Sequence, residues 1–247
     1  MRGTDPDPVG RPSKVDHVVV SVRGLDEAIS RWSRAGLAAT PGGSHPTGTA
    51  NALVRGPRDA YLELIDVVEE SDHATAHAVR ARPGPLTWAI SVPDLETCRR
   101  RLLEFGLETG DPVGSSRVAP DGDTYVWETC EIAGHVLHPF VPFLIRWKSG
   151  MPRGPVDGPV ISSLDLEVPD PLWLRELLVR CGLSPDESMA GIAAVTDGDL
   201  TVRLREGNAG VVAIDWAVAP PEPHVLLDGL VCNVRWQADP VGSMPHG

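Results

Sequence analysis

Three segments of the chain repeat one pattern of apolar and polar positions. Each begins with a short run of β-branched and other apolar residues, passes through a turn that contains Asp, and continues with the spacing of a helix of about three turns. The three segments are residues 15–37, 86–107 and 161–183. Each predicted helix ends at a Gly-Leu pair, and Gly readily adopts the left-handed conformation that stops a helix. A threefold repeat therefore organises the chain.

Further strand-like runs follow each predicted helix. They cover residues 51–56 and 60–68 after the first helix, 123–132 and 141–147 after the second, and 191–198, 200–207 and 210–218 after the third. The repeated unit is thus one strand, one helix and about three strands. This pattern predicts an α+β fold in which tandem βαβββ units form a cupped antiparallel sheet, with a third, degenerate unit.

Composition shifts mark the expected boundaries. Residues 1–13 are rich in Pro, Gly and Asp and are predicted to be disordered, and residues 149–159 read as a linker. Two paired units then occupy residues 14–148, a third unit occupies 160–218, and residues 219–247 form a C-terminal extension. The third unit has no evident partner within the chain, so we expect it to fold back on the first pair or to pair with another subunit. A homodimer would close its free edges.

Charge and composition exclude several classes of function. The 247 residues are 42% hydrophobic, which is enough for a sizeable core, and they carry a formal net charge of -12, which argues against nucleic acid or an anionic membrane as partner. No apolar run reaches the roughly 18 residues of a membrane span, and the N-terminus lacks the apolar segment of a signal peptide. The four cysteines lie far apart and form no Cys-x-x-Cys pair. We therefore expect a cytoplasmic protein.

Two stretches and the opening strand carry a family resemblance. Residues 41–67 read PGGSHPTGTANALVRGPRDAYLELIDV, residues 142–147 read PFLIRW, and the first strand reads VDHVVVSV. These elements resemble the glyoxalase-like domain subgroup of the vicinal oxygen chelate superfamily, which includes glyoxalase I, bleomycin-resistance proteins and extradiol dioxygenases. The resemblance covers residues 14–148 and reaches 160–218 only as a degenerate unit. It implies a divalent metal in the cleft between two units, with one ligand from the first strand and one from the last strand of each.

The first unit offers two of these ligands and the second unit offers none. The resemblance puts ligands at His17 and Glu63, and a carboxylate between two leucines needs a partner if it points inward. Aligning the second unit with the first puts Trp88 opposite His17 and Phe143 opposite Glu63, and neither side chain can ligate a metal. The matching positions of the third unit are Ser163 and about Val212. The four-ligand set is therefore incomplete.

His45 is the candidate for a third ligand, because flanking glycines allow its backbone to approach a site closely. With His17 and Glu63 it would supply two imidazoles and one carboxylate, a set that suits Zn, Ni, Mn or Fe(II). Such a metal would polarise a carbonyl and stabilise an enolate, and Glu63 would act either as ligand or as catalytic base. Thr49 and Asn51 are expected to contact the substrate.

Trp88 and Phe143 are expected to wall an apolar part of the same pocket. The leading hypothesis is a metal-dependent lyase or isomerase of the glyoxalase-like group that acts on a small oxygenated metabolite. The alternatives are a metal-free protein that sequesters a drug in this cleft, an Fe(II) ring-cleaving dioxygenase, and a noncatalytic interaction domain. No motif for nucleotide binding or for a serine hydrolase occurs in the sequence.

Overall fold

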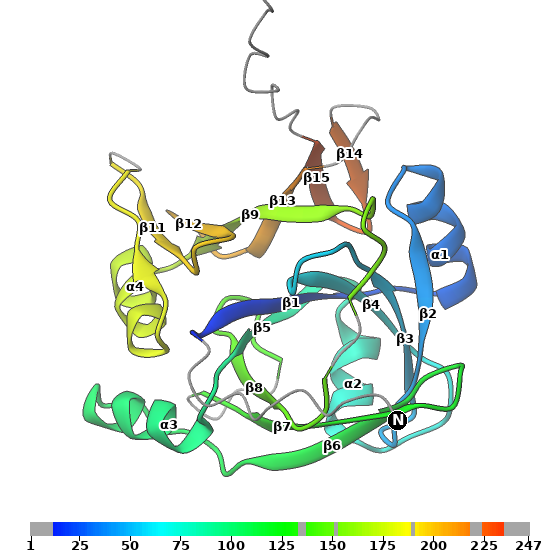
Figure 1. Cartoon of the computed structure of the whole chain (residues 1–247), viewed down its shortest axis with the longest axis horizontal. Coiled ribbons are helices and arrows are strands. Elements are labelled where there is room, and N and C mark those ends of the chain that lie inside the picture. Colours follow the sequence, from blue (N-terminus) through cyan, green and yellow to red (C-terminus); the bar gives the residue numbers. More distant parts are fainter. Residues whose placement is uncertain (1–11, 133–136, 151–152, 189–190, 218–223, 235–247) are drawn as a thin grey trace, which may run out of the picture.

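The computed structural model describes residues 12–132, 137–150, 153–188, 191–217 and 224–234. These residues form a closed eight-stranded barrel and a separate seven-stranded sheet that lies against it (Figure 1). In chain order the elements are β1 (Lys14–Ser21), α1 (Leu25–Arg34), β2 (Ala39–Ser44), β3 (Thr49–Val54), β4 (Tyr61–Val67), α2 (Ala74–Ala81), β5 (Gly84–Ser91), α3 (Leu95–Glu104), β6 (Val113–Val118), β7 (Thr124–Cys130), β8 (Phe143–Trp147), β9 (Val160–Val168), α4 (Pro171–Arg180), β10 (Ser184–Pro185), β11 (Ala193–Thr196), β12 (Thr201–Glu206), β13 (Gly210–Ala217), β14 (His224–Leu227) and β15 (Leu230–Val234). The helices among these elements have eight to ten residues each, so none of them could span a membrane.

The first unit, β1 to β4, shows how the predicted pattern folds. α1 buries Ala28 and Trp32 against the sheet and is followed by Gly36, which has φ 81°. The amide of Leu37 then donates to the carbonyl of Trp32, which satisfies the end of the helix. Because α1 carries the chain back to the end at which β1 begins, β4 runs parallel to β1 after two hairpins. The α+β class and the paired βαβββ units are confirmed, although the sheets are mixed and not purely antiparallel.

The second unit, β5 to β8 with α3, closes the barrel against the first. Strands β1 and β5 share a long antiparallel ladder, whereas β2 and β6 meet through the single pair Ser44 and Val118. Closure through both seams gives the strand order β1-β4-β3-β2-β6-β7-β8-β5. The barrel therefore has one strong seam and one weak seam, both between the two units.

The seven-stranded sheet contains the third unit and a partner for it. Strands β9 to β12 and α4 repeat the unit, and β12 pairs in parallel with β9 as β4 does with β1. Strand β13 then pairs with β9 as β5 pairs with β1, and the β14–β15 hairpin completes a fourth unit, whose described residues form strands alone. The third unit thus ends at β12 and has a partner within the chain. The predicted unit of residues 160–218 therefore includes β13, which the structure pairs with β9 as the first strand of the next unit. The helical pattern that marks the other units does not recur after β13, so the sequence showed no partner for the third unit.

A β-bulge recurs in the first strand of every unit. The extra residue of each bulge is Asp16, Leu86, Ser162 or Val212. Since a bulge shifts the alternation of side chains by one residue, equivalent positions must be counted from it. The residue that follows the bulge in β1 is His17, and the residue that follows it in β5 is Thr87. Thr87 is therefore the counterpart of His17, and the alignment that chose Trp88 is displaced by one position.

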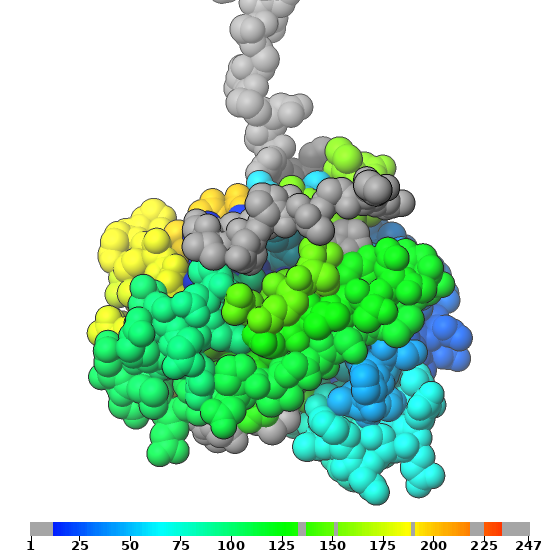
Figure 2. Space-filling view, turned by 60° about the horizontal axis from the view of Figure 1, so that its bottom comes forward, coloured from blue at the N-terminus to red at the C-terminus, as the bar shows by residue number. Residues whose placement is uncertain are grey.

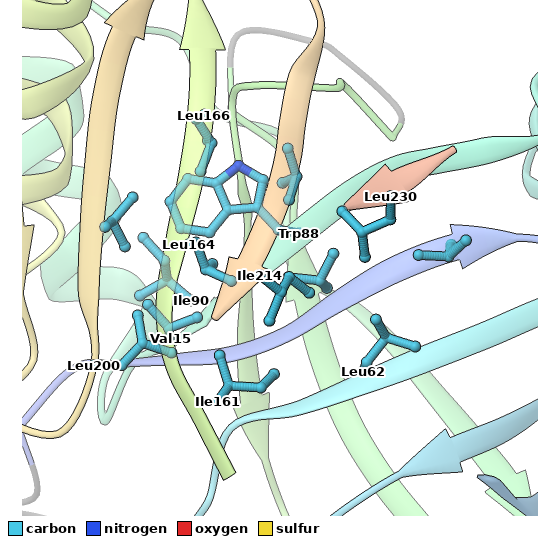
Figure 3. Close-up of a cluster of buried hydrophobic side chains, with 14 of the residues drawn as sticks. Val15, Leu62, Trp88, Ile90, Ile161, Leu164, Leu166, Leu200, Ile214 and Leu230 are labelled. Carbon is cyan, nitrogen blue, oxygen red and sulfur yellow. The ribbon is translucent and has the colours of Figure 1, made fainter. Parts of the chain in front are cut away.

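Trp88 lies on the outer face of the barrel, in the core between the two sheets. Its side chain is fully buried and packs among the apolar residues labelled in Figure 3, which come from both sheets. The indole Nε1 donates to the carbonyl of Phe140 at 3.0 Å. The apolar outer face of the barrel thus packs against β9, β12 and β13, and the inner face remains for other side chains.

Candidate functional site

The inside of the barrel contains a cavity of about 190 Å³ that is partly open to solvent. Both units contribute to its wall, and α2 contributes Thr75 at one side. In Figure 2 the segment that contains α2, in cyan, is seen next to the strands of the second unit, in green. The polar residues of the wall include His17, His45, Thr49, Asn51, Glu63 and Arg117, and the aromatic ones are Tyr61, Trp127, Phe143 and Trp147. The cavity is therefore a partly open site with largely apolar walls and a few converging polar groups, which is the usual character of a small-molecule site.

His17 is held in place by its neighbour in the bulge. The Nδ1 atom of His17 donates to Oδ1 of Asp16 at 2.6 Å, and Trp147 Nε1 donates to the other Asp16 oxygen at 2.9 Å. The imidazole stacks on Tyr61 with ring centroids 4.9 Å apart. These contacts fix the ring so that Nε2 lies 3.4 Å from Oε2 of Glu63.

Glu63 projects into the cavity from β4 and is 8% exposed. Its Oε1 accepts a hydrogen bond of 2.8 Å from Nδ2 of Asn51 on the neighbouring strand β3. The carboxylate thus has one oxygen fixed by Asn51, while the other faces His17. A carboxylate and an imidazole that face each other in a largely apolar cavity can exchange protons with a bound molecule.

The charge of His17 depends on these neighbours. Burial alone would lower the pKa of His17, but the hydrogen bond and charge of Asp16, together with the charge of Glu63, raise it above its ordinary value of 6.5. Protonation of His17 therefore stabilises the fold fully below that value. This contribution is lost as the pH rises through the pKa of His17 in the folded protein.

The Asp16→Asn variant is expected to lower the pKa of His17, because an amide cannot supply the charge that favours the imidazolium. The measurement is an NMR titration of the His17 ring in wild type and variant. Asp26→Asn, on the exposed side of α1, is the matched control and should leave that titration unchanged. An unaltered titration midpoint in Asp16→Asn would show that Asp16 does not set the charge of His17.

His45 lies next to this pair without joining it. Its Nδ1 is 2.9 Å from Thr49 Oγ1, and its Nε2 is 3.5 Å from Asn51 Nδ2. Burial is the main cause that lowers the pKa of His45, so the neutral ring is favoured. The Asn51 side chain donates to Glu63 and also lies beside His45. His45 is therefore connected to Glu63 through Asn51.

The side chains present do not make up a metal site of the expected kind. No group of three His, Cys, Asp or Glu in the described ranges is arranged to hold a metal ion. In the second unit, the positions equivalent to His17 and Glu63 carry Thr87 and Phe143, and the Phe143 ring meets the His17 ring edge-on at 5.6 Å. Two of the three expected ligands, His17 and Glu63, face each other. The third, His45, contacts Thr49 and Asn51. The donor set found here therefore does not fit the metal that the resemblance implied.

The structure brings most of the expected site residues together. His17, His45, Thr49, Asn51, Glu63 and Phe143 all line the cavity, whereas Trp88 does not. Asp16 and Arg117 were not expected from the sequence. The signal for Asp16 was its place next to His17 in an otherwise apolar strand. The isolated Arg in the polar strand β6 gave no comparable signal.

The seven-stranded sheet carries an ion network at the equivalent place. Counted from the bulge, Ser163 matches His17 and Arg203 matches Glu63. Arg203 donates to both oxygens of Asp165, at 2.6 and 2.8 Å, and to Asp215 at 2.7 Å. Ser163 donates to Asp215 as well, at 2.6 Å. This sheet therefore holds its own buried cation where the barrel has a cavity.

Comparisons with known proteins agree with this architecture. A hypothetical protein from Staphylococcus aureus is similar with a TM-score of 0.72 over 90% of this chain and 99% of its own, at 15% identity. A mutant of 4-hydroxymandelate synthase from Streptomyces coelicolor has a TM-score of 0.55 over 85% of this chain and 72% of its own, at 14% identity. At such low identity these likenesses show the fold alone. No curated protein matches the chain.

The family is shown by a different comparison. The model of the glyoxalase-like domain matches residues 15–182, which is more than half of the chain and includes both units of the barrel. The match also contains the residues on which the resemblance rested. The chain therefore belongs to the glyoxalase-like domain family.

Proposed function

We propose that this glyoxalase-like protein is an enzyme that transfers a proton on a small oxygenated metabolite, as a lyase or an isomerase. The observation that carries the proposal is the approach of His17 Nε2 to Glu63 Oε2, at 3.4 Å, in the wall of the barrel cavity. Both groups are buried and both are oriented by further hydrogen bonds. An acid and a base that are held together in this way are the requirement for general acid–base catalysis.

Each group has a distinct part in the proposed reaction. Glu63 removes a proton from the carbon next to a carbonyl. The electron pair of that C–H bond forms a carbon–carbon double bond, and the π pair of the carbonyl moves to its oxygen. Protonated His17 donates from Nε2 to the enolate oxygen that forms, which stabilises its charge. Asn51 holds the Glu63 carboxylate in position through its hydrogen bond. Return of the proton to another carbon or another face completes an isomerisation, and loss of a leaving group completes an elimination.

The size of the cavity favours a small substrate. Its volume of about 190 Å³ is below the roughly 300–1,000 Å³ of pockets that enclose drug-sized ligands. This favours a metabolite of a few carbon atoms and disfavours sequestration of a bulky drug. The aromatic walls keep a small-molecule binding protein without catalysis as the second candidate.

Solvent exchange is the direct test of the proposed proton transfer. The full chain is incubated in D₂O with pyruvate, 2-oxobutyrate, hydroxyacetone and lactaldehyde, and loss of the proton signals next to each carbonyl is followed by NMR. Exchange of at least one compound above the protein-free rate is expected. If none of them exchanges although one binds, the protein is a binding protein for that compound.

Metal content tests the metal-dependent form of the same function. In that form His17, His45 and Glu63 would hold Zn, Ni, Mn or Fe(II). Because the donor set does not fit, we expect elemental mass spectrometry to find no stoichiometric metal in wild type, even after soaking with each ion. About one metal per chain in wild type, absent in Glu63→Ala, would contradict the metal-free proposal. The substrate screen would then be repeated with the metal-loaded protein.

A further inference from the structure

Arg117 on β6 is a buried cation in the wall of the cavity. It is 3% exposed, and within the described residues no carboxylate lies within ion-pair distance of its guanidinium. Its Nη1 donates to Asn51 Oδ1 over a long 3.4 Å, and its Nε has no hydrogen-bond partner in the part of the chain that the structure describes. The guanidinium lies over the Tyr125 ring, 5.3 Å from the centroid. A charge that is buried with so few partners is unfavourable unless something else compensates it.

Asn51 keeps this cation apart from the catalytic carboxylate. Its Oδ1 faces Arg117, and its Nδ2 donates to Glu63 at 2.8 Å. The amide thus lies between the two opposite charges. As a result Arg117 retains N–H groups for a ligand, and Glu63 retains an oxygen for the reaction.

Two glycines of β2 make room for this arrangement. A Cβ on Gly42 would lie 2.2 Å from Asn51 Oδ1 and 3.0 Å from Arg117 Nη1. A Cβ on Gly43, whose φ is 138°, would lie 2.0 Å from the Val118 carbonyl and 3.0 Å from Arg117 Cγ. Both positions therefore exclude larger residues, and the Gly-Gly pair allows Arg117 to lie across the weak seam between β2 and β6.

We propose that the cavity takes a small carboxylate, and that Arg117 binds the carboxylate group. The planar guanidinium matches a carboxylate in a two-point geometry, and the cavity admits a molecule of a few carbon atoms. This inference rests on the proposed function, and it specifies the substrate as a small carboxylic acid. With its carboxylate at Arg117, its reactive carbon faces the Glu63 oxygen that Asn51 does not bind. Phosphate is disfavoured, because its second charge would repel Glu63.

Paired acids and amides test the inference on the full chain. Pyruvate, lactate and benzoate are titrated by calorimetry beside pyruvamide, lactamide and benzamide. At least one acid should bind about 10- to 100-fold more tightly than its amide, the range that hydrogen bonds to a charged group provide. In Arg117→Met that ratio should fall to about 1, and Arg117→Lys should retain part of it. Arg146→Met is the matched control, since Arg146 alternates with cavity-lining residues of β8 and points outward.

The outcomes that overturn the inference are specific. If no acid binds wild type more tightly than its amide, if the preference persists in Arg117→Met, or if inorganic phosphate binds more tightly than every acid, the cavity is not a carboxylate site. If Arg117→Met fails to fold, the comparison of acid and amide affinities in wild type and Arg117→Lys still tests the inference. The same titrations in Glu63→Gln separate the two proposals, because this variant lacks the base and should bind acids at least as tightly as wild type. An acid preference without solvent exchange refutes the proton transfer alone, and exchange without the preference refutes the carboxylate class alone.

Discussion

Replacement of Glu63 by Gln is expected to slow solvent exchange of the substrate by about 10²–10⁴-fold, the range that a positioned acid or base contributes. The amide has the shape of the carboxylate, and its carbonyl oxygen can still accept the hydrogen bond from Asn51. It cannot take up a proton from carbon. The measurement is the exchange rate in D₂O for the compound that wild type turns over fastest, across a range of pH.

The control for this variant is Glu128→Gln on β7. Glu128 pairs with Lys148 at 2.8 Å and lies between two residues that line the cavity, so it points away from it. Its replacement should leave the exchange rate unchanged. Exchange in Glu63→Gln within about threefold of wild type would exclude Glu63 as the base, and the base would then have to be sought at His17 or His45.

The second large effect concerns stability. Arg203→Met is expected to lower the free energy of unfolding by about 3–5 kcal/mol, as loss of one partner of a buried ion pair does. The substitution would leave Asp165 and Asp215 as buried carboxylates without their shared cation. Burial raises the pKa of Asp215, but hydrogen bonds from Ser163 and Arg203 outweigh burial and lower it, so the ionised form depends on these donors. The measurement is urea denaturation followed by circular dichroism.

Arg205→Met supplies the matched control two residues along the same strand. The Arg205 side chain is 58% exposed and lies 3.6 Å from Asp165, so its loss should cost about 0–1 kcal/mol. If both variants lose the same free energy of unfolding, the ion pairs of Arg203 stabilise the fold no more than a surface ion pair does. Because the network lies in the other sheet, neither variant should change the acid–amide preference of the cavity.

The fold was largely predictable because each helical unit repeats signals that are local. A β-branched run, an Asp before the helix and a Gly after it lie within about twenty residues of one another, and three copies of this pattern agree. The fourth unit was not predicted from the sequence, because the next described element after β13 is a hairpin, whereas the other units have a helix there. The alignment of β5 with β1 was displaced by one residue for a different reason. The bulge at Leu86 shifts the alternation by one residue, and a bulge leaves little trace in hydrophobic pattern.

The sequence predicted only the part of the site that lies within the first unit. His17, Asn51 and Glu63 lie on adjacent strands of the first unit, where the family pattern and the alternation of side chains point to one face. Arg117 enters from the second unit across the seam between β2 and β6, and its closeness to Asn51 depends on barrel closure. Sequence spacing carries no information about that closure.

The fourfold repetition also fixes how many ligands one chain should take up. A duplicated pair of units would offer two equivalent places, yet the register puts Arg203 and its carboxylates at one of them and the cavity at the other. The second place is already occupied by a side chain of the protein itself. A titration with a carboxylate should therefore reach its end point at one equivalent per chain, and its isotherm should show a single class of sites without cooperativity inside the chain.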